Sequence, residues 1–491
     1  MLFVLPYGIA LSNLIFQVFP LDYKFLLTHI INRVKIMFSI WVATFGHSEL
    51  KIVPLEYTGS QFELYNKISR NFQHAFLFES LTGPEELAET SIMGFDPLMI
   101  VRGYSDRITL SDKKGNTKTI LTTDPLSEIR KLLKNIPDQK YRYLGGAVGI
   151  INYDAIRLWE KIPDAHKESS LLMEFGIYTD GILYDNKAKK SFYFYYDTNR
   201  LSRISTEEPK FEKFEMSQVS ENLDSQRFSE MVTKSKRYIH DGDIFQVVLS
   251  RRFNFDAKGD LLKVYKALRQ INPSPYMYHI KMGEKTITGS SPEMLLRVTG
   301  SVVETFPIAG TRPITDDEPQ NEKMKQEMLS DEKELAEHTM LVDLGRNDIG
   351  RVCRYGSVHV KELMAVKRFS HVQHMVTHVV GTLDKKFDAF DAIKAVFPAG
   401  TVSGAPKIRA MEIIDELEPE SRGPYAGAVG YFSFNGCCDF AIAIRTIFFD
   451  GTKGFVQTGA GIVSDSIAEN EWMETQYKAN GMLTALKEAT K

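Results

Sequence analysis

The chain has 491 residues, of which 43% are hydrophobic and 25% charged, as is ordinary for a globular protein with a large core. Acidic and basic residues are well mixed and leave a formal net charge of -3, so we expect no nucleic-acid partner. Three cysteines without a C-x-x-C spacing argue against a disulfide framework and a cysteine-rich zinc site, which fits a reducing cytoplasm.

An apolar N-terminal extension occupies residues 1–48, and residues 1–21 carry no charged side chain. That stretch is nearly long enough to cross a bilayer, but it lacks the positively charged start of a signal peptide. Three interpretations are open: an upstream translation start with the protein beginning near Met37, an N-terminal helix packed on the domain, or a membrane anchor. We favour the first, and we therefore expect a cytoplasmic protein without a membrane partner.

The N-terminal region, residues 49–203, has the pattern of a mixed α/β protein. Short segments rich in aromatic and β-branched residues predict strands at 74–80, 143–153 and 191–198, and a helix is predicted at 124–136. The following run, 204–225, is polar and has few aliphatic residues to bury, so it is expected to be a linker.

A second region, residues 226–491, begins with a predicted helix at 227–243 and a predicted strand at 244–255. Strands and helices then continue without strict alternation, so a doubly wound parallel sheet is not required. We expect an α+β fold, a large two-layered sandwich of mainly antiparallel sheets flanked by helices.

Two helical stretches, 331–348 and 465–479, carry charged residues three and four positions apart, which places them on one helix face. Those residues are Asp331, Glu334, Glu337 and His338 in the first stretch, and Glu471, Glu474 and Lys478 in the second, where Asp465 or Ser466 can cap the helix. Each run taken alone is typical of a solvated helix face. Together, two such helices could hold Mg²⁺, which prefers a few carboxylates and substrate oxygens.

Glycine-rich segments form a further group, at 307–313, 398–418, 422–434 and 457–463. Glycine lets the backbone approach a ligand closely. The second segment leads through Pro406 and Lys407 into a helix whose first amides could hold an anion. Arg445 follows an apolar strand, where a carboxylate is its natural partner. Structural junctions and an internal salt bridge would explain the same features.

The most specific motifs are DIFQVVLSRRF, NPSPYMY, GSSPEML, PIAGTRP, KELAEHTMLVDLGRND, SHVQHMV, GTVSGAPKIRAMEII, GAVGYF, AIAIRT and GAGIVSDS. Through them the chain resembles the chorismate-utilising enzymes over roughly residues 50–491, and within that family the large subunits of anthranilate synthase (component I). The resemblance implies the chorismate-binding fold. It also implies conversion of chorismate and ammonia to anthranilate and pyruvate, a lyase reaction of tryptophan biosynthesis.

The resemblance implies roles for the acidic helices. Glu337 and Glu474 match the two glutamates that bind Mg²⁺ in the family. Glu334 matches a residue that protonates the departing 4-hydroxyl, and Glu471 matches a further acid near the metal. His374 matches a histidine associated with the later elimination of pyruvate.

The resemblance also implies substrate contacts. Tyr425 and Arg445 match the pair that holds the enolpyruvyl carboxylate. Another group of residues matches the family positions whose backbone lines the substrate: Gly310, Thr311, Gly459, Ala460 and Gly461.

Two positions separate the subfamilies. Ala309 stands where aminodeoxychorismate synthases commonly carry a nucleophilic lysine, and an alanine cannot attack. Gln246 stands where isochorismate-forming relatives have a lysine that activates water, and glutamine is not a base at neutral pH. Both differences favour attack by ammonia, with aminodeoxychorismate synthase component I as the alternative function.

Two kinds of partner are implied. No glutaminase module with a cysteine nucleophile is visible, so ammonia is expected from a separate glutamine amidotransferase subunit (component II). Feedback inhibition by L-tryptophan is implied by matches to the family's two tryptophan-contacting elements, Glu79 and Ser80 in one, and Asn272, Pro273, Pro275, Tyr276 and Met277 in the other. The same residues could simply join two sheets in the core.

Overall fold

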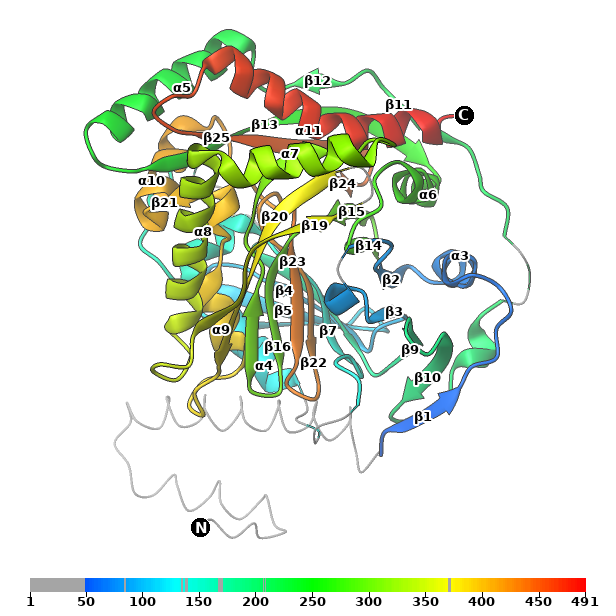
Figure 1. The fold of residues 1–491 in the computed structure, drawn as a ribbon. Helices are drawn as coiled ribbons and strands as arrows, with labels where there is room; N and C mark the ends of the chain where they lie inside the picture. Colours follow the sequence, from blue (N-terminus) through cyan, green and yellow to red (C-terminus); the bar gives the residue numbers. More distant parts are fainter. Residues whose placement is uncertain are drawn as a thin grey trace. The chain divides into compact units, whose positions relative to one another are not determined.

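Two large sheets and the helices around them make up the part of the chain that the structure describes (Figure 1). This computed structural model describes residues 49–83, 85–133, 136, 140–166, 171–205, 207, 209–369 and 372–491. The extension predicted at 1–48 lies outside the described residues. Among the described helices, none is both long and apolar enough to cross a membrane.

The first sheet contains 13 strands within the described residues. In spatial order these are β1 (Lys51–Pro54), β10 (Lys190–Tyr195), β9 (Asp180–Asp185), β3 (Thr90–Phe95), β2 (His74–Glu79), β14 (Tyr276–Met282), β15 (Lys285–Ser291), β24 (Thr446–Asp450), β25 (Lys453–Ile462), β13 (Gln246–Gly259) and β11 (Phe214–Met216). The short strands β12 (Ser220–Glu221) and β21 (Gly404–Ala405) also pair with β13. β13 and β25 form a long antiparallel ladder from Val247↔Ile462 to Asp256↔Lys453.

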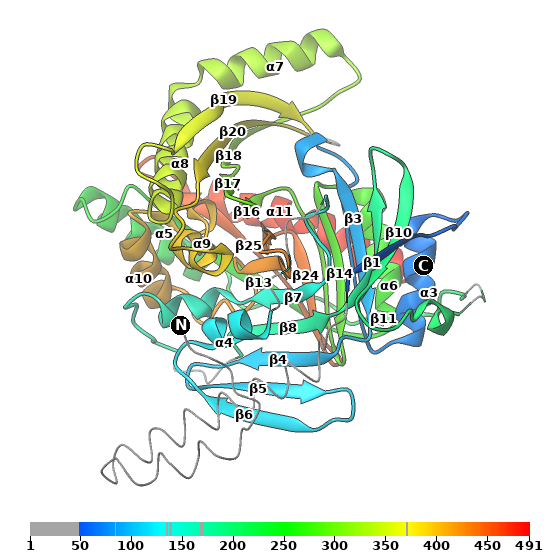
Figure 2. The same cartoon turned by 90° about the horizontal axis from the view of Figure 1, so that it is seen from below.

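The second sheet contains 12 strands, counted over the same residues. Their order is β18 (Ile308–Pro313), β20 (Val372–Thr382), β17 (Val302–Thr305), β16 (Met294–Thr299), β23 (Cys438–Ile442), β22 (Ala428–Ser433), β7 (Gly146–Ile151), β8 (Met173–Tyr178), β4 (Met99–Gly103), β5 (Arg107–Asp112) and β6 (Thr117–Leu121). β19 (His359–Arg368) pairs with β20. Figure 2 shows β4, β5 and β6 at one edge of this sheet and β18, β19 and β20 at the other, beside α7.

Helices cover the outer faces of the sheets. The α-helices are α3 (Gln61–Asn71), α4 (Pro125–Leu132), α5 (Ser225–His240), α6 (Leu261–Ile271), α7 (Glu318–Ser330), α8 (Glu332–Gly350), α9 (Ala389–Val396), α10 (Lys407–Leu417) and α11 (Ala468–Ala489). The described residues also contain the 3₁₀ turns η1 (Glu85–Leu87), η2 (Tyr153–Leu158), η3 (Leu201–Arg203) and η4 (Gly400–Val402). α11 packs against α5, α6 and β25, whereas α8 packs against α9, β18 and β20.

The core between the sheets is aromatic. Phe76 of β2 meets Tyr178 of β8 edge-on, with ring centroids 4.8 Å apart. Tyr143 meets Tyr431 of β22 in the same way, at 4.9 Å. Edge-to-face pairs of this kind add to the free energy gained from burying the rings. The observed pairings are antiparallel, and the expected α+β sandwich of antiparallel sheets is confirmed.

The predicted linker at 204–225 does not separate two structural units. It includes β11 and β12, which pair with β13. Strands from both sides of it share each sheet; for example, β2 pairs with β14, and β7 pairs with β22. The residues from Leu50 to Lys491 therefore form one compact unit.

Local predictions differ from the structure mainly at element ends. Asp331 is the N-cap of α8, where its side chain accepts hydrogen bonds from the amides of Lys333 and Glu334. The predicted capping of α11 by Asp465 or Ser466 is wrong, because the N-cap position is occupied by Ile467. The Ser466 hydroxyl instead accepts a hydrogen bond from the Val463 amide.

Candidate active site

A cavity of about 370 Å³, the main cavity, lies where α8 and α11 meet the ends of β13, β18 and β25. Of the twelve residues expected in catalytic, substrate-binding or metal-binding roles, ten line it: Gly310, Thr311, Glu337, His374, Tyr425, Arg445, Gly459, Gly461, Glu471 and Glu474. The two that do not line it are Glu334 and Ala460. Residues more than 160 positions apart in the chain are thus brought to one site.

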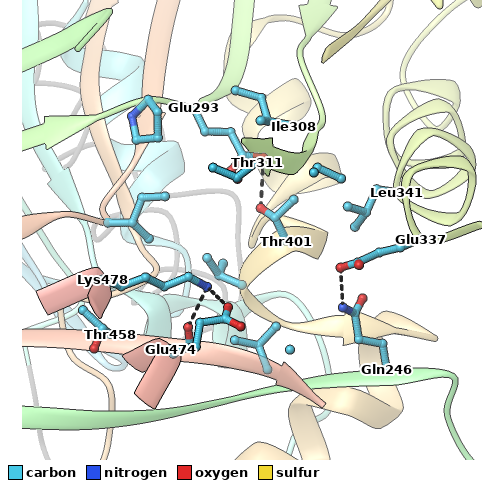
Figure 3. A pocket seen from close by; sticks show the side chains of 18 of the residues that line it. Gln246, Glu293, Ile308, Thr311, Glu337, Leu341, Thr401, Thr458, Glu474 and Lys478 are labelled. Carbon is cyan, nitrogen blue, oxygen red and sulfur yellow. Dashed lines mark hydrogen bonds and ion pairs between the residues drawn. The ribbon is translucent and has the colours of Figure 1, made fainter. Parts of the chain in front are cut away.

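The acidic helices approach this cavity from different sides (Figure 3). On α8, the Glu337 carboxylate accepts a hydrogen bond from Gln246 Nε2 at 2.9 Å. On α11, Glu474 forms an ion pair with Lys478 at 2.6 Å, and Lys478 Nζ also donates to the Gly459 carbonyl at 3.0 Å. Burial raises the pKa of Glu471, and the charge of Glu474 raises it further, against a hydrogen bond from Ser466.

These carboxylates suit a divalent cation. Two glutamates on separate helices line one cavity, and burial, together with the charge of Glu474, raises the pKa of Glu471, so a bound cation would stabilise the ionised acids. The described residues contain no cluster of three or more acidic, histidine or cysteine ligands. Mg²⁺ is commonly held by one or two carboxylates together with water and substrate oxygens, so this sparse ligand set fits it.

A cationic and a phenolic group lie in the same cavity. The Arg445 side chain forms no ion pair within 4 Å among the described residues, and burial lowers its pKa although the charge of Glu293 acts in the opposite direction. Tyr425 is buried, and a Cβ at Gly459 would lie only 2.8 Å from its hydroxyl, so glycine permits this close approach. A half-buried arginine without an ion-pair partner is costly, which is the arrangement expected where an anionic ligand completes the pairing.

His374 is held in one tautomer. Its Nδ1 lies 3.0 Å from the Gly310 carbonyl oxygen and 3.0 Å from Thr311 Oγ1. A carbonyl oxygen can only accept, so Nδ1 carries the proton. Burial and the charge of Arg445 lower the pKa of His374 to about 4. The ring is therefore neutral, and its buried Nε2, which has no hydrogen-bond partner in the structure, is an unprotonated base.

A model of the chorismate binding enzyme family matches residues 73–484. The chain belongs to this family. Among its curated relatives, anthranilate synthase component 1 of Methanothermobacter thermautotrophicus is 46% identical over 437 residues, covering 87% of this chain and 92% of that protein.

Solved structures also resemble this chain. Anthranilate synthase component I from Streptococcus pneumoniae is 36% identical, with a TM-score of 0.70, and the match covers 80% of this chain and 92% of that one. The menaquinone-specific isochorismate synthase of Escherichia coli, at 18% identity and a TM-score of 0.68, shares the fold over 94% of this chain and 99% of its own. The chorismate-binding fold predicted from the motifs is confirmed.

Two expected residues lie behind the surface of the main cavity. Glu334 forms an ion pair with Arg312 at 2.6 Å, and its other oxygen lies close behind Gly310. Ala460 is fully buried, because successive residues of β25 face opposite sides and its neighbours Gly459 and Gly461 face the cavity. Neither side chain reaches the main cavity in this structure.

Two other residues also differ from expectation. His338, expected on the face of Glu337, is fully buried and hydrogen-bonded to Thr377 Oγ1 at 2.6 Å. Lys407, expected to attract an anion, pairs with Asp348 at 2.5 Å and does not line the cavity. Consecutive residues of a helix lie only about 100° apart around its axis. The helical spacing therefore could not show that Glu337 faces the cavity whereas the next residue, His338, faces the core.

Glu293 lies in the GSSPEML motif and lines the main cavity, although its role could not be predicted from the sequence. Thr401 Oγ1 donates a hydrogen bond to its carboxyl group at 3.0 Å. Burial raises the pKa of Glu293 to about 8, although Thr401, the Ile308 amide and Arg445 act in the opposite direction. At neutral pH this carboxyl group is therefore mainly protonated and can donate a proton.

Five of the seven residues matched to the tryptophan-contacting elements line a second cavity of about 50 Å³, the inter-sheet cavity, whereas Asn272 and Pro273 do not line it. Strands β2, β3 and β14 of the first sheet and β22 and β23 of the second line it, together with Glu79, Ser80, Pro275, Tyr276 and Met277. The Glu79 carboxylate accepts hydrogen bonds from the Tyr265 hydroxyl at 2.7 Å and from Arg269 at 2.5 Å. Ser80 Oγ is buried and has no partner in the structure.

Arg251 anchors the helix that carries Glu471 and Glu474. Its side chain is fully buried and lies over the Trp472 ring, 3.4 Å from the centroid. It also donates to Thr475 Oγ1 at 2.6 Å and forms an ion pair with Glu221. Trp472 and Thr475 each follow one of the acids by one position, so Arg251 holds α11 on the flank next to them and limits the rotation of the helix about its axis.

Proposed function

We propose that this chain is the chorismate-converting subunit of an anthranilate synthase, a Mg²⁺-dependent lyase that makes anthranilate and pyruvate from chorismate and ammonia. The names of its relatives support the reaction. The observation that carries the proposal is the shared cavity, in which acids from α8 and α11 lie with an arginine that has no ion-pair partner among the described residues. Such a site suits a small dicarboxylate bound partly through a cation.

Substrate binding follows from the charges of the main cavity. Arg445 and Tyr425 hold the enolpyruvyl carboxylate, because a guanidinium and a phenol are both hydrogen-bond donors for it. The glycine backbone at Gly310, Gly459 and Gly461 leaves room for the ring. When Mg²⁺ is bound by Glu337 and Glu474, it neutralises and orients the ring carboxylate.

Loss of the 4-hydroxyl needs an acid, and Glu293 suits that role better than Glu334. Ammonia forms a bond to C2, the ring double bonds shift, and the C4–O bond breaks as the hydroxyl takes a proton. Glu293 lines the cavity and carries a proton at neutral pH. Glu334 is paired with Arg312 at 2.6 Å and does not line the cavity.

The second half of the reaction removes the C2 proton. His374 Nε2 is the base, because it is unprotonated and has no other hydrogen-bond partner. The electron pair of the C2–H bond enters the ring, the C3–O bond breaks, and enolpyruvate leaves and becomes pyruvate after protonation. The Nδ1 contact with the Gly310 carbonyl holds the ring orientation throughout.

At the two positions that distinguish the subfamilies, this chain has no residue that could activate water or attack the substrate covalently. Ala309 lines the main cavity without a reactive group. Gln246 also lines it, and its amide donates to Glu337, so it helps to orient that carboxylate. Ammonia, which is itself a nucleophile, needs no activating base at either position, and we propose that a glutamine amidotransferase subunit supplies it.

Regulation by L-tryptophan is a separate proposal for the inter-sheet cavity. Its lining combines aromatic and apolar groups with the Glu79 carboxylate and the Ser80 hydroxyl, which suits an amino acid with an aromatic side chain. At about 50 Å³ the cavity is smaller than a tryptophan, so binding requires the two sheets to separate locally. Such a shift is a means of linking this cavity to the catalytic region.

The proposed reaction can be tested with the purified chain, chorismate, ammonium and Mg²⁺. Anthranilate is identified by its fluorescence and mass, and pyruvate is measured in equal amount. A product that retains the enolpyruvyl group would instead indicate aminodeoxychorismate synthesis. Turnover that does not depend on ammonia would indicate attack by water and contradict the proposal.

A further inference from the structure

The backbone of Arg445 adopts a conformation that residues other than glycine rarely take. Its φ is 49°, in the left-handed region, where a Cβ comes too close to the following carbonyl oxygen. Arg445 joins β23 of the second sheet to β24 of the first, and both Arg445 and the preceding Ile444 line the main cavity. The left-handed turn therefore lies where the chain crosses between the sheets, at the edge of the substrate site. A backbone of this kind persists only where the surrounding structure holds it.

Two hydrogen bonds hold this turn. The Ser290 amide of β15 donates to the Arg445 carbonyl oxygen at 3.1 Å. The Thr446 hydroxyl donates to the Ile444 carbonyl oxygen at 2.7 Å, so it links the residues on either side of Arg445. The placement of the Thr446 hydroxyl therefore helps to set the conformation of Arg445.

A second hydroxyl group, that of Tyr278 in β14, holds the Thr446 hydroxyl in place. The two hydroxyl oxygens lie 2.6 Å apart, and both side chains are buried. Thr446 gives its single proton to the Ile444 carbonyl oxygen, which can only accept, so Tyr278 is the donor in the pair of hydroxyl groups. Tyr278 and Thr446 therefore form a chain of hydrogen bonds that ends at the residue before Arg445.

Gly289 of β15 permits this chain of hydrogen bonds. The strands β14, β15 and β24 are neighbours in the first sheet (Figure 1), and Gly289 pairs with Tyr278 on one side and with Thr446 on the other. A Cβ at Gly289 would lie 2.2 Å from a ring carbon of Tyr278, so the tyrosine ring lies directly over this glycine. The Tyr278 hydroxyl thereby reaches across the middle strand to Thr446.

We propose that Tyr278 and Thr446 are positioning residues for Arg445, a proposal that rests on the substrate-binding role proposed above for this arginine. Neither residue lines the main cavity, so both act through Arg445. Their hydrogen bonds hold the left-handed turn before the substrate arrives, and the guanidinium is already placed for the enolpyruvyl carboxylate. Chorismate binding then does not have to order the turn, which increases affinity.

Removal of single hydroxyl groups tests this proposal. Thr446→Val should weaken chorismate binding about tenfold and Tyr278→Phe about threefold, since the net contribution of one hydrogen bond lies in that range. Calorimetric titration with chorismate, in the presence of Mg²⁺ and the absence of ammonia, measures these affinities independently of turnover. Tryptophan is left out because Tyr278 also lines the inter-sheet cavity. Thr446→Ser keeps the hydroxyl group and should retain the wild-type affinity.

Two further measurements separate positioning from general stabilisation. Because the two hydroxyl groups belong to one chain of hydrogen bonds, the double variant should bind chorismate no more weakly than Thr446→Val alone. In the anthranilate assay, the KM for chorismate should rise in Thr446→Val and in Tyr278→Phe while kcat stays within about twofold of the wild type.

Tyr193→Phe is the matched control. Tyr193 is buried and donates to Asp180 at 2.5 Å, but it lies in β10 and does not line the main cavity. This variant should lose thermal stability without losing chorismate affinity. Unchanged chorismate affinity in whichever of Thr446→Val and Tyr278→Phe folds, additive losses in the double variant, or an equal loss in Tyr193→Phe would overturn the positioning roles. Failure of the wild-type chain to form anthranilate would instead contradict the proposed function.

Discussion

The main cavity and the inter-sheet cavity differ in how many of their ionisable side chains are paired within the protein. In the inter-sheet cavity, Glu79 is paired with Arg269 and Tyr265, and Asp439 accepts hydrogen bonds from Arg297 and Tyr276. In the main cavity, within the described residues, Arg445 has no ion-pair partner and His374 Nε2 has no hydrogen-bond partner. Groups already satisfied by the protein favour a stable packing, whereas groups left unsatisfied are available for a substrate.

The largest expected effect comes from the metal-binding acids. Glu337→Gln or Glu474→Gln should lower kcat/KM for chorismate about a thousandfold, because each removes one of two negative charges that hold the cation. Anthranilate fluorescence under saturating Mg²⁺ provides the measurement. Glu469→Gln is the control, since this acid lies on α11 but is exposed. Near-normal activity in both active-site variants would show that Glu337 and Glu474 do not bind a metal ion that turnover requires.

The next effect concerns the protonated carboxyl group. Glu293→Gln should reduce kcat about a hundredfold, since general acids contribute roughly that much or more. The pKa of Glu293 is raised to about 8, and only its protonated form donates. At a constant concentration of unprotonated ammonia, wild-type kcat should therefore fall as the pH rises through about 8. A variant that keeps this descending limb would show that another group titrates.

How much of the site could be predicted differs between α8 and the segment around Glu293. The helical spacing of Glu334 and Glu337 correctly indicated a shared face, and the motifs identified the family. The helical spacing could not show that, of these two acids, only Glu337 lines the cavity. Glu334 forms an ion pair with Arg312, which lies on a different element, β18. Nor could the spacing reveal Glu293, whose raised pKa arises from burial by segments distant in the sequence.

The sheet topology was also only partly predictable. The strands at β2, β7 and β10 followed from their aromatic and β-branched residues. Residues 204–225 read as a linker because strands as short as β11 and β12 bury few side chains and leave little pattern. Helix α7 was not predicted, and its weak separation of apolar and polar residues explains why.

A smaller effect tests how the main cavity is supported. Arg251→Met should weaken Mg²⁺ binding about tenfold, because residues behind metal ligands typically control affinity to that extent. Calorimetric titration of the folded variant with Mg²⁺ measures this directly. Arg200→Met removes another largely buried arginine, paired with Asp180 and Asp96, and should destabilise the chain without changing Mg²⁺ affinity. Equal Mg²⁺ affinities in the two variants would reduce Arg251 to a purely stabilising role.

The smallest effect on turnover is expected in the inter-sheet cavity. Glu79→Gln should leave anthranilate formation within about twofold of the wild type while weakening tryptophan binding about tenfold, since a charged hydrogen bond is lost. Calorimetry with tryptophan and a parallel activity assay separate the two quantities. Glu128→Gln, at another buried acid, should change neither. Unaltered tryptophan affinity in Glu79→Gln would place regulation elsewhere.

The central claim is that α8 and α11 share one cation that helps to hold the substrate. Chorismate affinity measured by calorimetry with and without Mg²⁺ tests it most directly, in the absence of ammonia. We predict that Mg²⁺ strengthens chorismate binding at least about tenfold in the wild type and has no such effect in Glu474→Gln. Equal chorismate affinity in the wild type with and without Mg²⁺ would contradict the claim.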